Sequence, residues 1–266
     1  MVDTHAASIE GTAMVESFAW PDGQRAAISL TFDDARPSQL SRGLPILDRH
    51  GVKASFYVTL GSMEDRLSEW QEAVARGHEI GNHTTTHPCS GNYAFARQNA
   101  LENYTLQQIE DDILQASQAI ERRLELTPST FAYPCGQTFV GRGESRRSYV
   151  PVVARRFLVG RRAFDEVAND PLICDLACAT GVDMDGVSWP QIQTVLEQTV
   201  KEGRWLILVG HDVGDGGPQT VLAESLDSLC RYCRESGRGL WIDTVAAIGS
   251  YVAGVQSRTI PHKDPI

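Results

Sequence analysis

The chain has 266 residues, of which 42% are hydrophobic and 22% are charged, and its formal net charge at pH 7 is −10. This composition is ordinary for a globular protein, it excludes a low-complexity chain, and the length suits one large domain or two small ones. No basic run is interleaved with aromatic residues, so we expect no nucleic-acid partner and favour a neutral ligand. No stretch approaches the roughly 20 apolar residues that span a bilayer.

The N-terminal segment and the cysteines bear on the cellular compartment. Residues 1–6 have neither a basic start nor an apolar core of about 7–15 residues, so they do not form an intact signal peptide. Six cysteines are spread thinly through the chain, which is not the density of a small secreted scaffold. We therefore expect reduced thiols and a cytoplasmic location.

Apolar, β-rich runs alternate with amphipathic helical segments almost from end to end. Strands are expected at residues 26–32, 54–60, 78–82, 130–133, 156–159, 176–180, 205–209 and 240–242. Helices are expected at residues 38–50, 68–76, 189–202 and 220–236, and a further long helix begins after a capping box at Thr105 and Gln108. Because parallel neighbours need crossover connections, this alternation predicts a parallel sheet. With seven or eight such units and no linker, a closed β/α barrel is favoured over two domains.

Distinctive polar residues follow five of these expected strands. Ligands of parallel α/β folds bind at the carboxyl ends of the strands, so these segments are expected to converge on one rim. They are Asp33-Asp34, His83 with His87, Pro134-Cys135-Gly136, Arg161-Arg162 and His211-Asp212. Two long connections, residues 88–103 and 137–151, are expected beside this rim. Their candidate substrate contacts are Tyr93, Phe95, Arg142, Arg146, Arg147 and Tyr149.

Two of these segments together indicate a metal site. His83 and His87 are four residues apart, a spacing that places both imidazoles on one side of a helical turn. Two imidazoles and one carboxylate with an open position are a common catalytic site for zinc or a similar ion. Asp33 and Asp34 end a strand, where successive side chains point in different directions, so one can bind the metal while the other faces the bound water. The alternative is an aspartate that caps the following helix, which leaves the second aspartate without a role.

Four motifs make the interpretation specific. They are Thr31-Phe32-Asp33-Asp34, His83-Thr-Thr-Thr-His87, Phe131-Ala-Tyr-Pro-Cys-Gly136 and Leu208-Val-Gly-His211. In order and spacing they resemble the polysaccharide deacetylase family (carbohydrate esterase family 4), which comprises chitin, peptidoglycan and acetylxylan deacetylases. The resemblance covers about residues 25–250. It implies a single-domain α/β fold, a distorted (β/α) barrel of about seven parallel strands at residues 21–255, with tails at residues 1–20 and 256–266.

The resemblance also implies the catalytic roles. Asp33 is similar to the family's catalytic base, and His211 is similar to its catalytic acid. Asp34, His83 and His87 resemble the ligands of one divalent ion, for which Zn²⁺ is the first expectation and Co²⁺ or another divalent ion the alternative.

Substrate contacts follow from the same resemblance. Pro134 and Cys135 belong to the family's third motif, and the backbone N–H of Cys135 is expected to stabilise the oxyanion. Leu208 matches the leucine beside the acetyl methyl group. Trp189 is a looser match to the aromatic wall of that pocket, and a place in the core is the alternative for it.

The third motif departs from the family pattern. Where this chain has Ala132, the family commonly has an arginine, which pairs with the catalytic aspartate. Where this chain has Cys135, the family commonly has a tyrosine. A nearby cation lowers the pKa of an aspartate and orients it. We expect Arg161 or Arg162 to supply this charge, the alternative being that both are solvated. Cys135 has the further alternative roles of nucleophile or extra metal ligand.

The expected reaction is hydrolytic removal of acetyl groups from an N-acetylated, or O-acetylated, oligo- or polysaccharide. Asp212, next to His211, is a candidate for orienting that imidazole. Two other functions stay open: an allantoinase-like amidohydrolase of a small cyclic amide, and a catalytically inactive carbohydrate-binding relative. The pattern does not determine the sugar or the oligomeric state.

Overall fold

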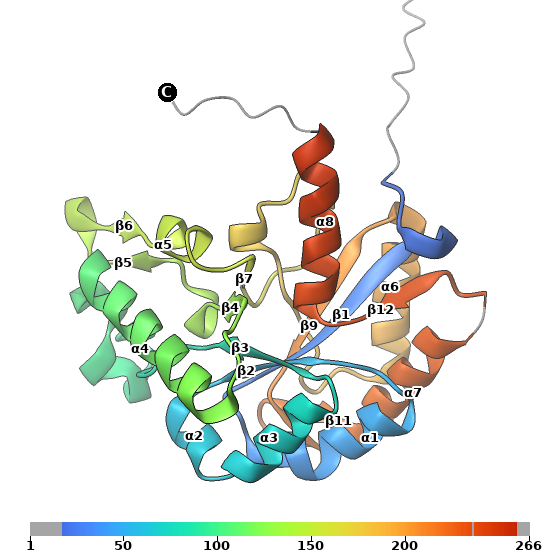
Figure 1. Ribbon diagram of the computed structural model, residues 1–266, viewed down its shortest axis with the longest axis horizontal. Helices are drawn as coiled ribbons and strands as arrows, with labels where there is room; N and C mark the ends of the chain where they lie inside the picture. Colours follow the sequence, from blue (N-terminus) through green and yellow to red (C-terminus); the bar gives the residue numbers. More distant parts are fainter. Residues whose placement is uncertain (1–17, 236, 260–266) are drawn as a thin grey trace, which may run out of the picture.

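The computed structural model describes residues 18–235 and 237–259. At its centre is an eight-stranded sheet in the order β7-β4-β3-β2-β1-β9-β8, with β12 paired to the first half of β1. Every pairing in this sheet is parallel, as the alternation of strands and helices predicted. The sheet curls into a half-barrel (Figure 1) and not into the closed barrel that the alternation favoured. Its strands are β1 (Ala26–Asp33), β2 (Ser55–Val58), β3 (Glu79–Asn82), β4 (Thr130–Ala132), β7 (Val159–Arg161), β8 (Val182–Asp183), β9 (Trp205–Gly210) and β12 (Leu240–Ile242).

Helices cover the two faces of the sheet unequally. Along β1, Ile28, Leu30 and Phe32 belong to the core under the outer helices α1, α3, α6 and α7, whereas Ala27 belongs to the core under α8. Figure 1 shows α8 on the face opposite α1 and α3. The α-helices are α1 (Leu44–Arg49), α2 (Leu60–Glu64), α3 (Leu67–Ala75), α4 (Leu106–Leu124), α5 (Val150–Ala154), α6 (Trp189–Glu202), α7 (Ala223–Arg234) and α8 (Val245–Thr259). Within the described ranges, none of these helices combines the length and hydropathy needed to cross a membrane.

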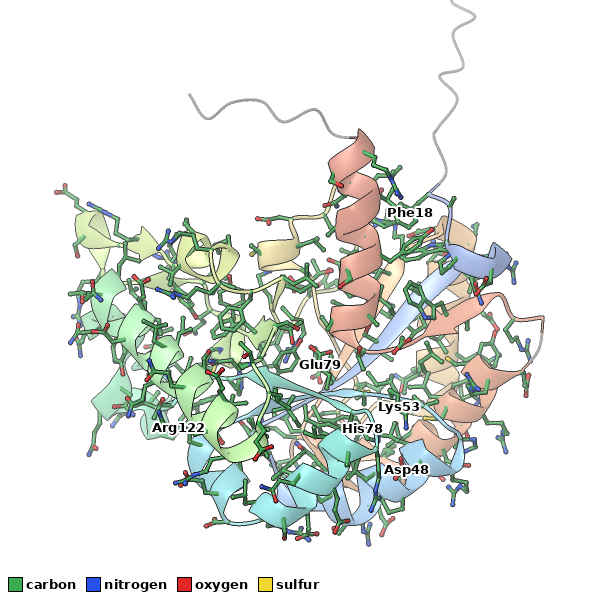
Figure 2. All side chains as sticks on the ribbon, in the orientation of Figure 1. Phe18, Asp48, Lys53, His78, Glu79 and Arg122 are labelled. Carbon is green, nitrogen blue, oxygen red and sulfur yellow. A yellow bond between two sulfur atoms is a disulfide. The ribbon has the colours of Figure 1, made fainter. Side chains whose placement is uncertain are left out.

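A half-buried carboxylate, that of Glu79, fixes α8 at the amino end of the half-barrel. Glu79 (Figure 2) accepts hydrogen bonds from the Ser55 hydroxyl at 2.6 Å, from the Ala246 amide at 2.9 Å and from the Thr130 hydroxyl. Since the Glu79 contacts occupy this end of the sheet interior, the opposite end, where the strands terminate, is left for the site. Phe18 and Trp20 pack on Tyr251 of α8. The packed region is therefore wider than the expected domain of residues 21–255.

Several predicted elements are confirmed and others are wrong. The capping box at Thr105 begins α4, and α6 has the predicted bounds. In place of the strand expected at residues 176–180, a 3₁₀ turn forms, because the Asp175 side chain accepts a hydrogen bond from the Ala177 amide. The strand of this region, β8, begins only after that turn, at Val182. Short strands also form two small pairs outside the main sheet: β5 (Phe139–Val140) runs antiparallel to β6 (Arg147–Ser148), and β10 (Asp212–Gly214) runs parallel to β11 (Thr220–Leu222).

Candidate active site

The carboxyl ends of β1, β3, β7 and β9 meet at one pocket of about 280 Å³. Each strand brings a titratable side chain to this end because parallel strands terminate at the same edge. The lining residues are Asp33, Asp34, Arg36, His83, His87, Phe95, Cys135, Ala163, Phe164, His211 and Gln219. The expected convergence of distant segments therefore holds for the aspartates, the three histidines and Cys135.

Asp34, His83 and His87 form a compact ligand set. The Nε2 atoms of His83 and His87 lie 3.7 and 3.5 Å from the same oxygen, Asp34 Oδ1. His83 Nδ1 donates to the Ala132 carbonyl at 2.9 Å, so its Nε2 faces the cluster. One ligand atom from each residue lies within 4.8 Å of the others. Two imidazoles and a carboxylate that converge in this way fit a divalent ion of the zinc type.

The segment that carries both histidines is a loop, not the helical turn that their spacing suggested. Thr84 and His87 have positive φ angles of 65° and 48°. The carboxylate of Asp112, from α4, accepts hydrogen bonds from the amides of Thr85 and Thr86 at 2.7 and 3.2 Å. These amides are thereby held by α4 and are not used within a helix. Because α4 holds the backbone of this loop, both imidazoles are presented to the pocket.

An arginine that the sequence did not single out holds the other side of Asp34. Arg36 Nη2 lies 3.0 Å from Asp34 Oδ2, and its Nη1 lies 2.8 Å from Asp212. One oxygen of Asp34 therefore faces the imidazoles while the second is held by a cation. Burial, together with the charge of His83, lowers the pKa of His87 to about 4, so His87 is neutral at pH 7, as a metal ligand must be.

Asp33 is buried and paired with Arg161. Arg161 Nη2 donates to Asp33 Oδ1, the Arg161 side chain is fully buried, and its guanidinium lies 4.8 Å from the centre of the Tyr57 ring. Burial by itself would raise the pKa of Asp33, but the charge of Arg161, with those of His83 and His211, lowers it to about 2. Asp33 is therefore ionised across the neutral range.

The register of the sheet explains why Arg161 takes this position. Arg161 in β7 is the direct cross-strand partner of Ala132 in β4, so the two side chains share a face about 4.8 Å apart. The next residue, Arg162, pairs with Asp165 instead. The cation missing at Ala132 is thus supplied by the neighbouring strand.

His211 is oriented by Asp185, a residue that received no role from the sequence motifs. Asp185 Oδ2 accepts a hydrogen bond from His211 Nδ1 at 2.6 Å, and its Oδ1 accepts one from the His211 amide at 3.1 Å. Burial opposes protonation, yet the Asp185 bond and the charge of Asp33 raise the pKa of His211 overall. Asp212, the candidate named for this orientation, instead contacts Arg36 and Ser38.

The structure does not bring two expected substrate contacts, Leu208 and Trp189, to the pocket lining. Leu208 faces the outer core, since it lies three positions before His211 and side chains alternate along a strand. Trp189, at the start of α6, packs on the core and on Tyr232 with ring centres 5.4 Å apart. Pro134 is buried and absent from the pocket lining, whereas Cys135 lines the pocket.

Cys135 is joined to Cys89 by a disulfide, so the expectation of reduced thiols is wrong for these two residues. In this state Cys135 offers no thiolate, which removes its alternative roles as nucleophile and metal ligand. The bond ties the loop after His87 to the turn after β4. The remaining cysteines of the described chain are free thiols: Cys174, Cys178, Cys230 and Cys233.

Comparisons with known proteins are consistent with this geometry. Residues 21–142 match a family model described as polysaccharide deacetylase. The chain is 30% identical over 110 residues to a peptidoglycan-N-acetylglucosamine deacetylase of Listeria monocytogenes, a match that covers 41% of this chain and 21% of that protein. It spans well under half the length of the curated relatives it matches.

Solved structures show the same fold. A Mycobacterium smegmatis protein described as a polysaccharide deacetylase matches with a TM-score of 0.67 and 14% identity, over 94% of this chain and 96% of that one. A family 4 acetyl xylan esterase of Clostridium thermocellum, solved in complex with a cobalt ion, matches with a TM-score of 0.55 and 22% identity, over 85% of this chain and 91% of that one.

The ligand set predicts one divalent ion per chain. Replacing Asp34 with Ala removes the only carboxylate of the set and is expected to weaken binding of Zn²⁺ or Co²⁺ by more than about a hundredfold. Metal content after dialysis, measured by mass spectrometry, checks this. His50→Gln, which breaks a pair with Asp227 outside the pocket, is the control. Equal metal content in the D34A variant and the wild type would contradict the assignment.

The Cys89–Cys135 bond closes a long loop and is expected to stabilise the fold. Changing both cysteines to Ser should lower the free energy of unfolding by about 2–4 kcal/mol, measured by urea denaturation. A reductant should bring the wild type to the stability of the double variant and leave that variant unchanged. If the reductant has no effect on the wild type, the bond contributes nothing.

Proposed function

We propose that this chain, whose residues 21–142 match the polysaccharide deacetylase family model, is a metal-dependent hydrolase that removes acetyl groups from N-acetylated or O-acetylated carbohydrate. One observation supports this above the others. An ionised aspartate, a metal-ligand set and a histidine of raised pKa line the same small pocket. Ester or amide hydrolysis needs a base, an electrophile for the carbonyl and an acid for the leaving group, and these groups match that requirement.

Asp34, His83 and His87 would hold one divalent ion, Zn²⁺ in this proposal and Co²⁺ as the alternative. When bound, such an ion polarises the acetyl carbonyl and lowers the pKa of a water molecule. Arg36 holds the outer oxygen of Asp34 and the Ala132 carbonyl holds His83 Nδ1, so both ligands are oriented from outside the set.

Asp33 is proposed as the base. Its Oδ1 is occupied by Arg161, while Oδ2 lies 3.8 Å from His83 Nε2 and faces the ligand set. An attacking water beside that set could transfer its proton to Oδ2. Because Asp33 is ionised at neutral pH, no prior deprotonation is needed.

His211 is proposed as the acid. Asp185 holds Nδ1, which leaves Nε2 to donate a proton to the departing sugar amine or hydroxyl. The raised pKa keeps a larger share of His211 protonated near neutral pH. The Cys135 N–H is proposed as the oxyanion donor, at a turn where Cys135 has a φ of 52° and lines the pocket.

Two aromatic side chains at the pocket support a carbohydrate substrate. Phe95 and Phe164 are 67% and 57% exposed, although both line the site. Exposed aromatic rings at a pocket entrance offer flat apolar surfaces, on which the apolar face of a sugar ring can pack. A cyclic amide would not require such a surface.

Acetate release tests the proposal. Oligomers of N-acetylglucosamine and acetylated xylo-oligosaccharides would be assayed with the protein as purified, after chelation, and after addition of Zn²⁺ or Co²⁺. Release should disappear on chelation and return with metal, and Asp33→Asn should lower kcat by about 10²–10⁴-fold without loss of bound metal. Absence of release from every substrate by metal-loaded protein would overturn the proposal.

The Arg161–Asp33 pair predicts a pH effect. With Arg161 present, the pKa of Asp33 is about 2. In Arg161→Ala, burial without this counter-charge should raise the pKa of Asp33. The acid limb of the kcat/KM profile should therefore move to higher pH. The double variant Ala132→Arg with Arg161→Ala returns a cation to the same face and should move the limb back. Arg162→Ala is the control. An unchanged acid limb in R161A contradicts the prediction.

A further inference from the structure

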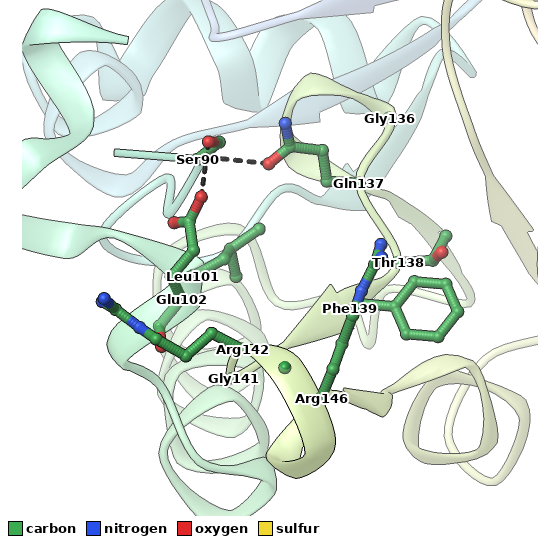
Figure 3. Close-up of a pocket in the computed structure, with 11 residues that line it drawn as sticks. Ser90, Leu101, Glu102, Gly136, Gln137, Thr138, Phe139, Gly141, Arg142 and Arg146 are labelled. Carbon is green, nitrogen blue, oxygen red and sulfur yellow. Dashed lines mark hydrogen bonds between the residues drawn. The ribbon is translucent and has the colours of Figure 1, made fainter. Parts of the chain in front are cut away.

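A second cavity, of about 510 Å³ (Figure 3), lies at the turn that follows Cys135. It shares two loops with the catalytic pocket: Ser90 follows Cys89, and Gly136 follows Cys135, so the disulfide joins loops that line both cavities. A third wall comes from residues 138–146, around the β5–β6 hairpin. The two cavities therefore meet at the turn that carries Cys135 and Gly136.

The cavity presents Arg146, whose guanidinium lies over an aromatic ring. The guanidinium of Arg146 lies 4.2 Å from the centre of the Phe139 ring, and Figure 3 shows the two side chains side by side. Within the described part of the chain, this guanidinium forms no hydrogen bond or ion pair. A guanidinium held flat by an aromatic ring keeps its edge of N–H donors available to a planar anion.

The other polar groups add donors, and the Glu102 carboxylate of the lining already accepts two hydrogen bonds. Gln137 accepts a hydrogen bond from the Ser90 amide at 2.7 Å, which leaves its own NH₂ group to donate. The Glu102 carboxylate already accepts from the Ser90 hydroxyl at 2.5 Å and the Gly91 amide at 2.9 Å. Arg142 contacts Asn103 and the Glu102 carbonyl through Nη2 and Nε, so its Nη1 is also available.

We propose that this cavity binds a carboxylate on a sugar next to the acetylated unit, so that the substrate is an acidic glycan. Two arginines against one glutamate leave a single positive charge on the lining, which matches a monoanion. The planar Arg146 edge matches the two oxygens of a carboxylate. The net charge of −10 favoured a neutral ligand, but at cellular salt a local pair of arginines outweighs distant charges. This inference rests on the proposed deacetylase function, because that function supplies the reaction for which the cavity would bind the substrate.

Arg146→Gln tests the cavity directly. Acetylated xylo-oligosaccharides with and without a glucuronic acid side group provide the same backbone with and without the carboxylate. For the acidic substrate R146Q should raise KM by about tenfold or more and leave kcat unchanged, and for the neutral one it should change neither. Arg147→Gln is the matched control, because Arg147 is adjacent, exposed and outside the cavity lining. Equal KM values for wild type and R146Q on the acidic substrate would overturn the proposal.

A binding measurement separates this proposal from the reaction. Calorimetric titration of the same oligosaccharides after chemical deacetylation needs no turnover. Tighter binding of the acidic oligosaccharide by the wild type, lost in R146Q, supports the cavity even if no acetate is ever released. Acetate release with equal affinity for both oligosaccharides would overturn the cavity assignment while the deacetylase proposal stands.

Discussion

The site depends on one buried ion pair, between Asp33 and Arg161. Removing two charges from water costs several kcal/mol per ion, and the mutual attraction offsets this only where geometry and additional hydrogen bonds are good. Here Arg161 also donates to the Arg162 carbonyl at 3.1 Å and lies over Tyr57. Without the cation, burial would raise the pKa of Asp33 and favour its protonated form.

The adjacent aspartates are distinguished by their cations. Asp33 is paired with a fully buried arginine from β7, whereas Asp34, with a positive φ of 75°, turns outward to the half-exposed Arg36. The backbone reversal at Asp34 lets two consecutive carboxylates face one pocket from different sides. One oxygen of each carboxylate is held by an arginine, and the other faces His83. This arrangement separates a proton acceptor from a metal ligand within two residues.

The sequence predicted those parts of the fold and site that follow from topology. Parallel strands end at one edge, so Asp33, His83, Arg161 and His211 could be brought together from strand positions alone. Asp185 could not, because it lies in a loop after a two-residue strand and its contact with His211 has no periodic signal. Leu208 was misplaced for a local reason, the alternation of side chains along β9. The disulfide depends on how two loops approach, which cysteine spacing does not determine.

The exchange of an arginine between strands shows why position in space matters more than position in a motif. Ala132 and Arg161 are paired residues on one face of neighbouring strands, so a cation from either strand reaches the same carboxylate. A long side chain on β4 would compete for the volume that Arg161 fills, and the small Ala132 side chain is compatible with the buried guanidinium. The departure at Ala132 and the unusual burial of Arg161 are therefore one structural feature. A motif with a missing charge is informative only once the residue opposite it in the sheet has been examined.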